Sequence, residues 1–223
     1  MSSFSIYAQE IATDRPSAQT DNSYTLYHKA FQLESGILYS FNSGINQPIS
    51  IPNLLIRYGA FDKIEFRFSS DLLYNASENE FSINPIQLGT KIQIVRKESF
   101  QLSLISMTTL DNTHQNTNIK IVGNNLISNK FSIGYTFGNN FSENGNSFNY
   151  SIFLNNSFSE KISGFFEFYG FSEYQAPTNK HAINFDFGGS YKLSDIIQVD
   201  AYFGKGLNND MYFTSLGFSY LFN

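Results

Sequence analysis

The sequence predicts an all-β fold, an up-and-down antiparallel transmembrane β-barrel of about twelve strands over residues 30–223. Three observations predict it. Large apolar residues alternate with small or polar ones from residue 30 to the end of the chain, and helical spacing does not recur. The chain has 24 Phe, 14 Tyr and only 15% charged residues, against roughly 25% in average soluble domains. Long polar connections also alternate with short turns, as they do in barrels that cross a membrane.

Each expected strand has one face of large apolar side chains, because successive side chains of a strand point to opposite sides. In the first strand, for example, Phe31 and Leu33 lie on one face and Gln32 lies on the other. The expected strands are 30–42, about 52–60, about 63–74 and about 86–95, then strands around 100–104, 119–127, 131–137, 148–154, 162–168, 183–191, 197–203 and 215–222. An even number of this size lies within the range of bacterial barrels.

A soluble β-sandwich also alternates, and two features weigh against it. No Asp, Glu, Lys or Arg falls on the large-apolar face of any expected strand, and the other face favours Gly, Ser, Asn and Gln. A charge that faces lipid at mid-bilayer costs roughly 2–4 kcal/mol, so a membrane barrel is expected to avoid it. The mean hydropathy of -0.24 and the lack of an apolar run near roughly 18 residues exclude a helical membrane protein.

The expected connections are rich in Asn, Ser, Gly and Pro, and long ones alternate with short ones without a break. The long connections are 42–50, 75–85, 111–118, 139–147, 172–180 and 205–209, and the short turns are 61–63, 96–99, 128–130, 157–160 and 192–195. Short turns are periplasmic in bacterial barrels, so both termini are expected on the periplasmic side.

The residues before the first strand are too polar to span a membrane. Residues 1–9 are interpreted as the remnant of a signal peptide, because Phe4–Glu10 resembles the end of a secretory signal. The basic start of such a signal is missing, so an ordinary N-terminal tail is the alternative. Residues 10–29 are expected to be either a periplasmic tail or a plug that folds into the barrel. In a plug, Asp14 and Arg15 would meet charges of the lumen.

The last expected strand carries a pattern of its own. Its residues follow the order polar, any, Gly, any, any, aromatic, any, aromatic, and the fixed positions are filled by Ser215, Gly217, Tyr220 and Phe222. This pattern resembles the C-terminal sorting signal of bacterial outer-membrane barrels. It predicts the bacterial outer membrane as the location, with outer-membrane lipid around the barrel and the barrel-assembly machinery as a partner during insertion.

The same alternation predicts which charged side chains point into the lumen. They are Glu34, Arg57, Glu65, Arg67, Asp71, Lys91, Lys120, Glu167, Asp186 and Asp200. Two interpretations are open: these groups line a solute path, or they pair with one another across strands because buried charges need partners. Barrels of eight strands are filled by side chains and those of sixteen hold an aqueous channel, so a strand number between them does not decide whether this lumen is open or filled.

Several classes of partner are excluded. The net charge of -5 and a pI near 5.1 argue against nucleic acid, which needs a basic patch. The absence of Cys excludes disulfides and thiolate metal sites. No spacing typical of phosphate or metal binding occurs, so no cofactor is expected.

An outer-membrane lipid hydrolase is a remote alternative, since the chain has neither G-x-S-x-G nor H-E-x-x-H. Ser172 and His181 are the one candidate pair, expected on adjacent strands at the external rim with both side chains toward lipid. Such a pair could attack an acyl ester if a third group oriented the histidine. His28 and His114 are expected to be exposed to solvent. We therefore expect that the protein is not an enzyme.

Four segments occur in an order that carries a family resemblance. They are Thr13–Pro16, Phe31–Gly36, Leu54–Gly59 and Asp62–Arg67. Their succession resembles the bacterial outer-membrane family named for the MetA pathway of phenol degradation, also described as a transporter family. The resemblance is most specific over residues 13–71. It implies a barrel with a channel role, and hydrophobic or aromatic compounds as solutes.

Two functions follow from these features. The first is a channel or transporter-like barrel for passive passage or binding of small solutes, with the inward polar residues along the route. The second is a non-conducting structural barrel in an outer-membrane protein complex. A lumen in which every charge is paired would favour the second, and a continuous path as wide as water would favour the first.

Overall fold

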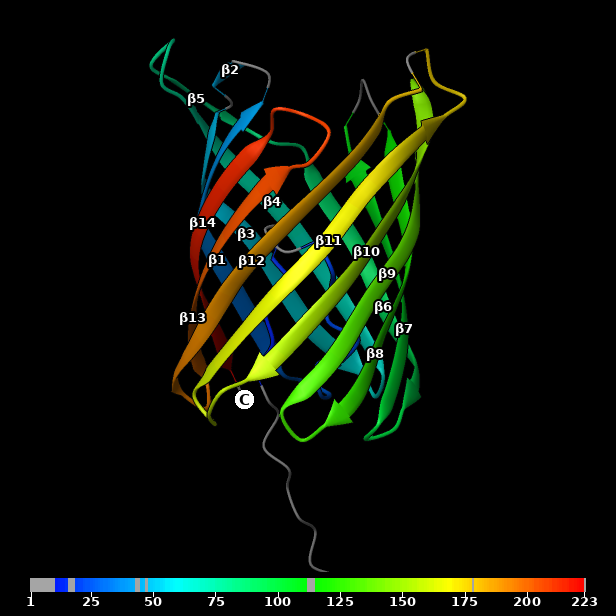
Figure 1. The fold of residues 1–223 in the computed structure, drawn as a ribbon, viewed down its shortest axis with the longest axis vertical. Coiled ribbons are helices and arrows are strands. Elements are labelled where there is room, and N and C mark those ends of the chain that lie inside the picture. The colour runs from blue at the N-terminus through cyan, green and yellow to red at the C-terminus, as the bar shows by residue number, and fades with distance from the viewer. Residues whose placement is uncertain are drawn as a thin grey trace, which may run out of the picture.

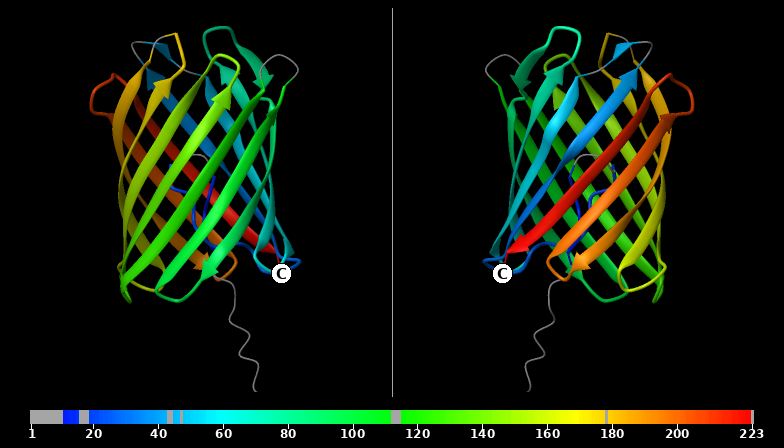
Figure 2. Two further views of the ribbon diagram at one scale, coloured as in Figure 1. Left: turned by 90° about the vertical axis from the view of Figure 1, so that its right-hand side faces the viewer. Right: turned by 90° about the vertical axis from the view of Figure 1, so that its left-hand side faces the viewer.

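The computed structural model is a closed antiparallel β-barrel (Figures 1 and 2). It describes residues 11–15, 19–42, 45–46, 48–111, 115–177 and 179–222. The expected signal remnant at residues 1–9 and the side chain of His114 lie outside the described residues. Within the described ranges, no helix is long and apolar enough to cross a membrane.

The strands follow one another around the wall, each antiparallel to its neighbours. They are β1 (Phe31–Asn42), β2 (Ile45–Asn46), β3 (Ile49–Phe61), β4 (Ile64–Asn75), β5 (Glu80–Ile83), β6 (Ile86–Arg96), β7 (Phe100–Leu110), β8 (Asn116–Ser128), β9 (Phe131–Ser142), β10 (Gly145–Ser157), β11 (Ile162–Tyr174), β12 (His181–Ser194), β13 (Ile197–Gly206) and β14 (Tyr212–Phe222). This up-and-down order follows from short connections, which join strands that are neighbours in both sequence and space.

The two short strands continue long strands across a proline. β2 pairs with the end of β1, and Pro48 separates it from β3, which pairs with the rest of β1. β5 pairs in the same way with the end of β4, and Pro85 separates it from β6. Proline has no backbone N–H for the ladder, so it interrupts a strand. The barrel therefore has twelve strands around its circumference, which confirms the predicted fold and strand number.

The seam between β1 and β14 closes the barrel. It pairs Phe31 with Phe222 and Gly36 with Gly217 in one unbroken register. The rings of Phe31 and Phe222 meet edge to face, with centroids 5.4 Å apart. Closure gives every strand two neighbours, so no edge of the sheet is left with unpaired backbone groups. The last strand of the chain thus seals the barrel against the first.

The two faces of the wall differ as the alternation predicts. Phe66 and Phe218 are exposed on the outside, whereas Glu34, Glu65 and Lys91 on the inside are fully buried. An apolar exterior around a polar interior is the arrangement of a barrel that sits in lipid.

The strands run further than expected, which corrects the prediction of long connections. β9 ends at Ser142 and β10 begins at Gly145, so most of the expected connection 139–147 is strand. β2 and β5 likewise occupy parts of the expected connections 42–50 and 75–85. The polar residues there hid the continuing ladder, because backbone pairing does not require apolar side chains.

One charge lies on the outer face. β13 continues to Gly206, and this places the exposed Lys205 opposite Phe185 and Tyr212. Lys205 was expected in the connection 205–209, and it reaches the apolar face because β13 runs beyond the expected strand 197–203. Lys205 is next to the end of its strand, where a long side chain can carry its ammonium group to the polar interface.

Candidate functional site

The described parts of the N-terminal segment, residues 11–15 and 19–29, run inside the barrel (Figure 2). At the end of the barrel where the chain enters β1, Ile11 and Leu26 pack with Ala30 and Leu221 in a buried apolar cluster. The backbone N–H of Lys29 donates to the carbonyl of Gly59 at 2.7 Å. The segment is thus tied to the wall at the end of the barrel where the chain enters β1, and it continues into the lumen.

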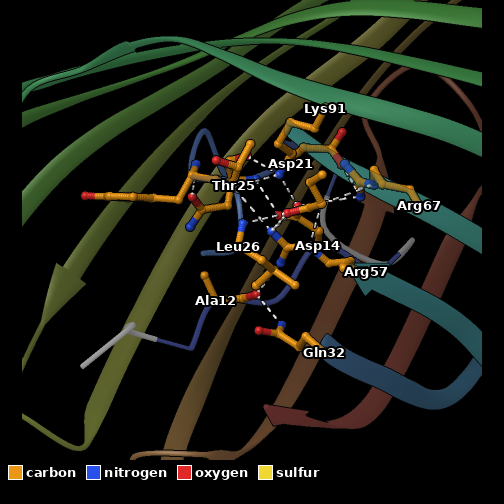
Figure 3. A network of polar contacts seen from close by, with 12 residues as sticks. Ala12, Asp14, Asp21, Thr25, Leu26, Gln32, Arg57, Arg67 and Lys91 are labelled. Atoms are coloured by element: carbon orange, nitrogen blue, oxygen red, sulfur yellow. Dashed lines mark hydrogen bonds and ion pairs between the residues drawn. The ribbon is translucent and has the colours of Figure 1, made fainter. Parts of the chain in front are cut away.

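Asp14 is the centre of the polar contacts inside the barrel (Figure 3). Its carboxylate forms an ion pair with Lys91 and lies 3.4 Å from Nη2 of Arg57 and 3.5 Å from Nη2 of Arg67. All four side chains are almost completely buried. Three strands, β3, β4 and β6, therefore direct a cation at one carboxylate of the N-terminal segment.

The wall by itself places like charges next to each other. Arg57 and Arg67 are direct cross-strand partners on β3 and β4, an arrangement that is destabilising between like charges. Glu65 relieves part of this repulsion, because its Oε1 accepts a hydrogen bond from Nε of Arg57 at 2.8 Å. Asp14 lies against both guanidinium groups and supplies the other negative charge. The positive charges of this wall are fully balanced only when the N-terminal segment is present.

Two wall carboxylates also hold the backbone of the segment. Oε2 of Glu34 accepts hydrogen bonds from the backbone N–H groups of Asp14 and Arg15, both at 2.6 Å. Oε2 of Glu65 accepts one from the backbone N–H of Leu26 at 3.0 Å. Buried carboxylates that accept several charge-assisted hydrogen bonds fix the path of a chain, since each N–H has a defined direction. We call the inward charges of β1, β3, β4 and β6 the ionic half of the lumen: Glu34, Arg57, Glu65, Arg67 and Lys91.

Arg15 lies across the closing seam. It forms an ion pair with Asp200 on β13 and donates a hydrogen bond from Nη1 to Oγ of Ser215 on β14 at 2.8 Å. Its guanidinium group covers Gly36 and Gly217, the paired glycines of β1 and β14, and a Cβ at either position would collide with it. The sequence analysis placed Gly217 in the C-terminal sorting pattern. The structure adds the contact of Gly217 with the Arg15 guanidinium.

Asp21 forms the second acidic contact of the segment. Its Oδ1 accepts a hydrogen bond from Nη2 of Arg67 at 3.0 Å, and its Oδ2 accepts one from Nζ of Lys120 at 2.8 Å. Burial alone would raise the pKa of the Asp21 carboxyl, but the cations of Lys120 and Arg67 outweigh it and hold that pKa below its usual range. Asp21 was not among the predicted site residues, because the sequence before the first strand has no alternation from which to infer a direction.

Three of the predicted lumen carboxylates have no cationic partner among the described residues. Asp71 lies apart and accepts hydrogen bonds from the amide of Asn53 at 3.0 Å and 3.1 Å. Glu167 accepts hydrogen bonds from the N-terminal segment, including the backbone N–H of Gln19 at 2.9 Å. Asp186 faces Glu167 across the ladder, and the carboxyl groups of these two residues are joined by a side-chain hydrogen bond.

The opposite wall is lined by aromatic rings. We call its inward rings on β10, β11, β13 and β14 the aromatic half of the lumen: Phe153, Phe165, Tyr169, Tyr202 and Phe213. Phe165 stacks on Phe153 with centroids 4.8 Å apart and meets Tyr202 at 5.1 Å. Tyr202 in turn carries the Arg15 guanidinium at 5.5 Å from its ring centroid, a cation–π distance.

A cavity of about 410 Å³ lies between the aromatic half and the N-terminal segment. Tyr169, Phe171 and Phe213 contribute apolar surface, and Asn149 and Asn184 contribute amides. These residues belong to the parts of β10, β11, β12 and β14 that are remote from the short turns, so the cavity lies in the half of the barrel away from the end where the chain enters β1. Gln19 of the N-terminal segment lines it as well.

Sequence reasoning missed these rings because it considered only charged residues as lumen groups. The sequence did contain an indication of these rings. Phe166 and Phe168 have the parity of the outer face, so Phe165, Tyr169 and Phe171, at the positions between and beside them, have the parity of the lumen. A strand with rings at consecutive positions has apolar side chains on both faces. In a membrane barrel one of those faces must be the lumen.

Ser172 and His181 are direct cross-strand partners on β11 and β12, as the sequence predicted. No hydrogen bond joins their side chains in the described part of the chain. The His181 ring instead stacks against Tyr150, with centroids 6.5 Å apart. His28, which is exposed, contacts the carbonyl of Ala60 through Nδ1 at 2.9 Å.

A closed twelve-stranded barrel with an apolar exterior and a polar interior defines an outer-membrane β-barrel protein. The family described as "Putative MetA-pathway of phenol degradation" matches residues 13–222 of this chain. The chain therefore belongs to that family, and the resemblance inferred from its segments is confirmed. None of the curated proteins matches the sequence.

Solved structures share the fold at low sequence identity. An outer-membrane channel from Pseudomonas putida F1 has a TM-score of 0.71 and 10% identity, and the match covers 90% of this chain and 98% of that one. The KdgM porin, solved in complex with disordered oligogalacturonate, has a TM-score of 0.61, 13% identity and coverage of 85% and 99%. The CymD monoaromatic hydrocarbon channel has a TM-score of 0.54, 8% identity and coverage of 89% and 90%.

Proposed function

We propose that this protein is an outer-membrane channel for the passive passage or binding of small solutes. The observation that carries the proposal is the cavity of about 410 Å³ in the half of the lumen away from the end where the chain enters β1. Its volume lies within the range of small-molecule sites, roughly 300–1,000 Å³, and such sites combine apolar walls with a few polar groups. Membership of a family of outer-membrane barrels supports the same function.

The N-terminal segment acts as a plug in this proposal. Asp14, Arg15 and Asp21 hold it to the wall through buried ion pairs, and Gln19 lies at the cavity. A solute that reaches the cavity from outside must displace the segment, or part of it, to reach the periplasm. The inward charges of the ionic half then serve to hold the plug, rather than to line an open path.

Hydrophobic or aromatic solutes are the favoured class. Tyr169, Phe171 and Phe213 give the cavity ring surfaces on which another ring can stack. Among the structures of similar fold, CymD is a monoaromatic hydrocarbon channel, whereas KdgM was solved with an oligogalacturonate. An acidic sugar is a poorer match to this cavity, because its lining offers one cation, Lys120, which already binds Asp21.

Planar-bilayer conductance tests both the channel and the plug. The full chain is expected to conduct weakly, and removal of residues 10–27 is expected to raise the conductance several-fold, because that deletion empties the lumen of the segment. A variant that lacks only residues 2–9 is the control and should behave like the full chain. Equal conductance of the full chain and the 10–27 deletion would eliminate the plug.

A non-conducting structural barrel in an envelope complex is the second candidate. The observation that favours it is the complete pairing of the ionic half, where each carboxylate and each cation has an opposite charge within ion-pair distance. Absence of conductance in both the full chain and the deletion variant would favour this candidate. In either case we propose that Ser215, Gly217, Tyr220 and Phe222 form the sorting signal read during insertion.

A further inference from the structure

Two carboxyl groups face each other inside the aromatic half. Glu167 on β11 and Asp186 on β12 are direct cross-strand partners, and both are fully buried. Neither forms an ion pair with any described residue. Like charges opposite each other are destabilising, and buried carboxylates without a cation are costly, so this pair differs from every other acidic group near it.

Apart from Asp71, the remaining inner charges of the described residues are balanced. Asp14, Asp21, Glu34, Glu65 and Asp200 each form an ion pair, and their partners are Arg15, Arg57, Arg67, Lys91 and Lys120. These carboxylates and cations are equal in number, so they leave no positive charge for the acid pair. Glu167 has only hydroxyl and N–H donors, from Gln19 and Thr20. Asp186 has one polar contact, a side-chain hydrogen bond with Glu167, so the two carboxyl groups share a proton and no other described group donates to Asp186.

Aromatic rings lie over the glycines next to Asp186. Its other cross-strand partner is Gly204, and a Cβ at Gly204 would collide with the ring of Phe213. Two residues along β12, a Cβ at Gly188 would collide with the rings of Tyr202 and Phe165. The glycines on both sides thus let rings lie close to the carboxylate. The face of an aromatic ring attracts cations, and most strongly where water is excluded.

The acid pair also lies beside the cavity. Asn184 and Tyr169, which precede Asp186 and follow Glu167 by two positions on the same inner face, both line it, and so does Phe213. A solute in the cavity therefore contacts the two inner-face residues that flank the carboxyl groups along their strands. A metal ion would need more oxygen ligands than this pair offers, and no cluster of three or more His, Asp or Glu suited to a metal occurs in the described ranges.

We propose that Glu167 and Asp186 form the binding site for a small organic cation, an ammonium compound with an aromatic or alkyl body. The ammonium group takes the place beside the two carboxyl groups, where it balances the negative charge that they share. The apolar body lies in the cavity against Tyr169 and Phe213. This site deepens the proposed channel function, on which it rests for the route by which the solute arrives.

The test measures binding to the purified full chain in detergent by isothermal titration calorimetry, so it needs no transport. The probe is 2-phenylethylammonium, with 2-phenylethanol as its neutral counterpart and calcium as a metal cation. The ammonium compound is expected to bind at least about tenfold more tightly than the alcohol, which corresponds to about 1.4 kcal/mol. Calcium is expected not to compete.

Two variants locate the site. Asp186→Asn and Glu167→Gln keep the shape of each side chain and remove a charge, and each is expected to weaken ammonium binding about tenfold or more. Asp71→Asn is the matched control, because Asp71 is also a lumen carboxylate without a cationic partner but lies apart from the pair. Circular dichroism and heat-modifiable migration on gels establish that each variant folds.

Equal binding of the ammonium compound and the alcohol would overturn the proposal, and this comparison does not depend on any variant. Displacement of the ammonium compound by calcium would also overturn it, in favour of a metal site. Loss of binding in Asp71→Asn but not in Asp186→Asn would place the site elsewhere. If the barrel conducts but does not bind the ammonium compound, the inference fails and the channel stands. If it binds but does not conduct, the channel fails and the site stands.

Discussion

The ionic half and the aromatic half of the lumen fill the interior of the barrel in different ways. In the ionic half, Arg57 and Arg67 face each other across the ladder, and the wall carboxylates balance only part of their charge, so a carboxylate from the N-terminal segment supplies the rest. In the aromatic half, Phe165 packs directly on Phe153 and Tyr202, and a cavity remains beside the rings. The ionic half therefore needs the N-terminal segment to balance its charges. The rings of the aromatic half pack on one another and leave a cavity beside them. We infer that the first binds the plug and the second binds the solute.

The largest effect is expected from Asp14→Ala, which tests whether the ionic half depends on the segment. Removal of one partner from a buried ion pair leaves an uncompensated charge and destabilises by about 3–5 kcal/mol. Here three cations, on Arg57, Arg67 and Lys91, lose their shared carboxylate. Thermal unfolding monitored by gel migration measures the loss. The control is Asp62→Ala at the exposed ion pair with Arg96, where little change is expected.

Phe213→Ala tests whether the two halves are independent. The ring is buried, and removal of a buried Phe costs about 3 kcal/mol at the lower end of the usual range, because one side of this ring already borders the cavity. We expect weaker binding of aromatic solutes and no release of the N-terminal segment. Limited proteolysis of that segment would report its release, and increased cleavage in Phe213→Ala would show that the halves are coupled.

Gly217→Ala is expected to destabilise by about 1–3 kcal/mol, since the added Cβ collides with the Arg15 guanidinium. The measurement uses protein refolded in vitro, so that any effect on sorting is excluded. Gly134→Ala is the matched control, because its Cβ would make only ordinary contacts, the nearest at 3.4 Å. If the collision is the cause, Gly217→Ala in an Arg15→Ala background should cost much less than in the natural chain.

A smaller effect is expected from acidification. The pKa of Asp21 is lowered in the folded chain from its ordinary value of 3.8, so its contribution to stability is fully present above that value. The contribution is lost as the pH falls below 3.8 and the carboxylate takes up a proton. The difference in unfolding temperature between the natural chain and Asp21→Asn should therefore shrink with falling pH. A difference that grows on acidification would contradict the ion pairs of Asp21 with Lys120 and Arg67.

No effect is expected from Ser172→Ala on phospholipid hydrolysis, because Ser172 and His181 form no hydrogen bond and lie outside both halves of the lumen. The assay compares the purified natural chain and the variant in phospholipid micelles. Hydrolysis by the natural chain that disappears in Ser172→Ala would revive the hydrolase alternative.

The features of the wall could be predicted because they are local. Alternation in the sequence gave the strand number and the inward direction of residues such as Glu34 and Asp186, since each side chain of a strand has only two possible directions. The ends of the strands were harder to predict from the sequence. Polar hairpin tips such as Ser142 to Gly145 pair through their backbone, and nothing in their side chains marks the ladder.

The contacts of the N-terminal segment could not be predicted in the same way. Asp14 meets Lys91, and Arg15 meets Asp200, across long separations in the sequence and without any periodic pattern. Such pairs depend on the path of an irregular chain through a finished lumen. The pair Arg57 and Arg67 did indicate that the wall needs a further carboxylate, because the two strands in register place these two cations face to face.

The position of Arg15 on Gly36 and Gly217 has a consequence for the order of assembly. A ribosome makes residue 15 near the beginning of the chain and residue 217 near its end, and the surface that receives the guanidinium exists only after the first and last strands have met. The segment that is synthesised first must therefore be the last to reach its final place. A barrel closed in the wrong register would offer Arg15 no flat surface, so a docked N-terminus distinguishes a correctly closed barrel from a faulty one.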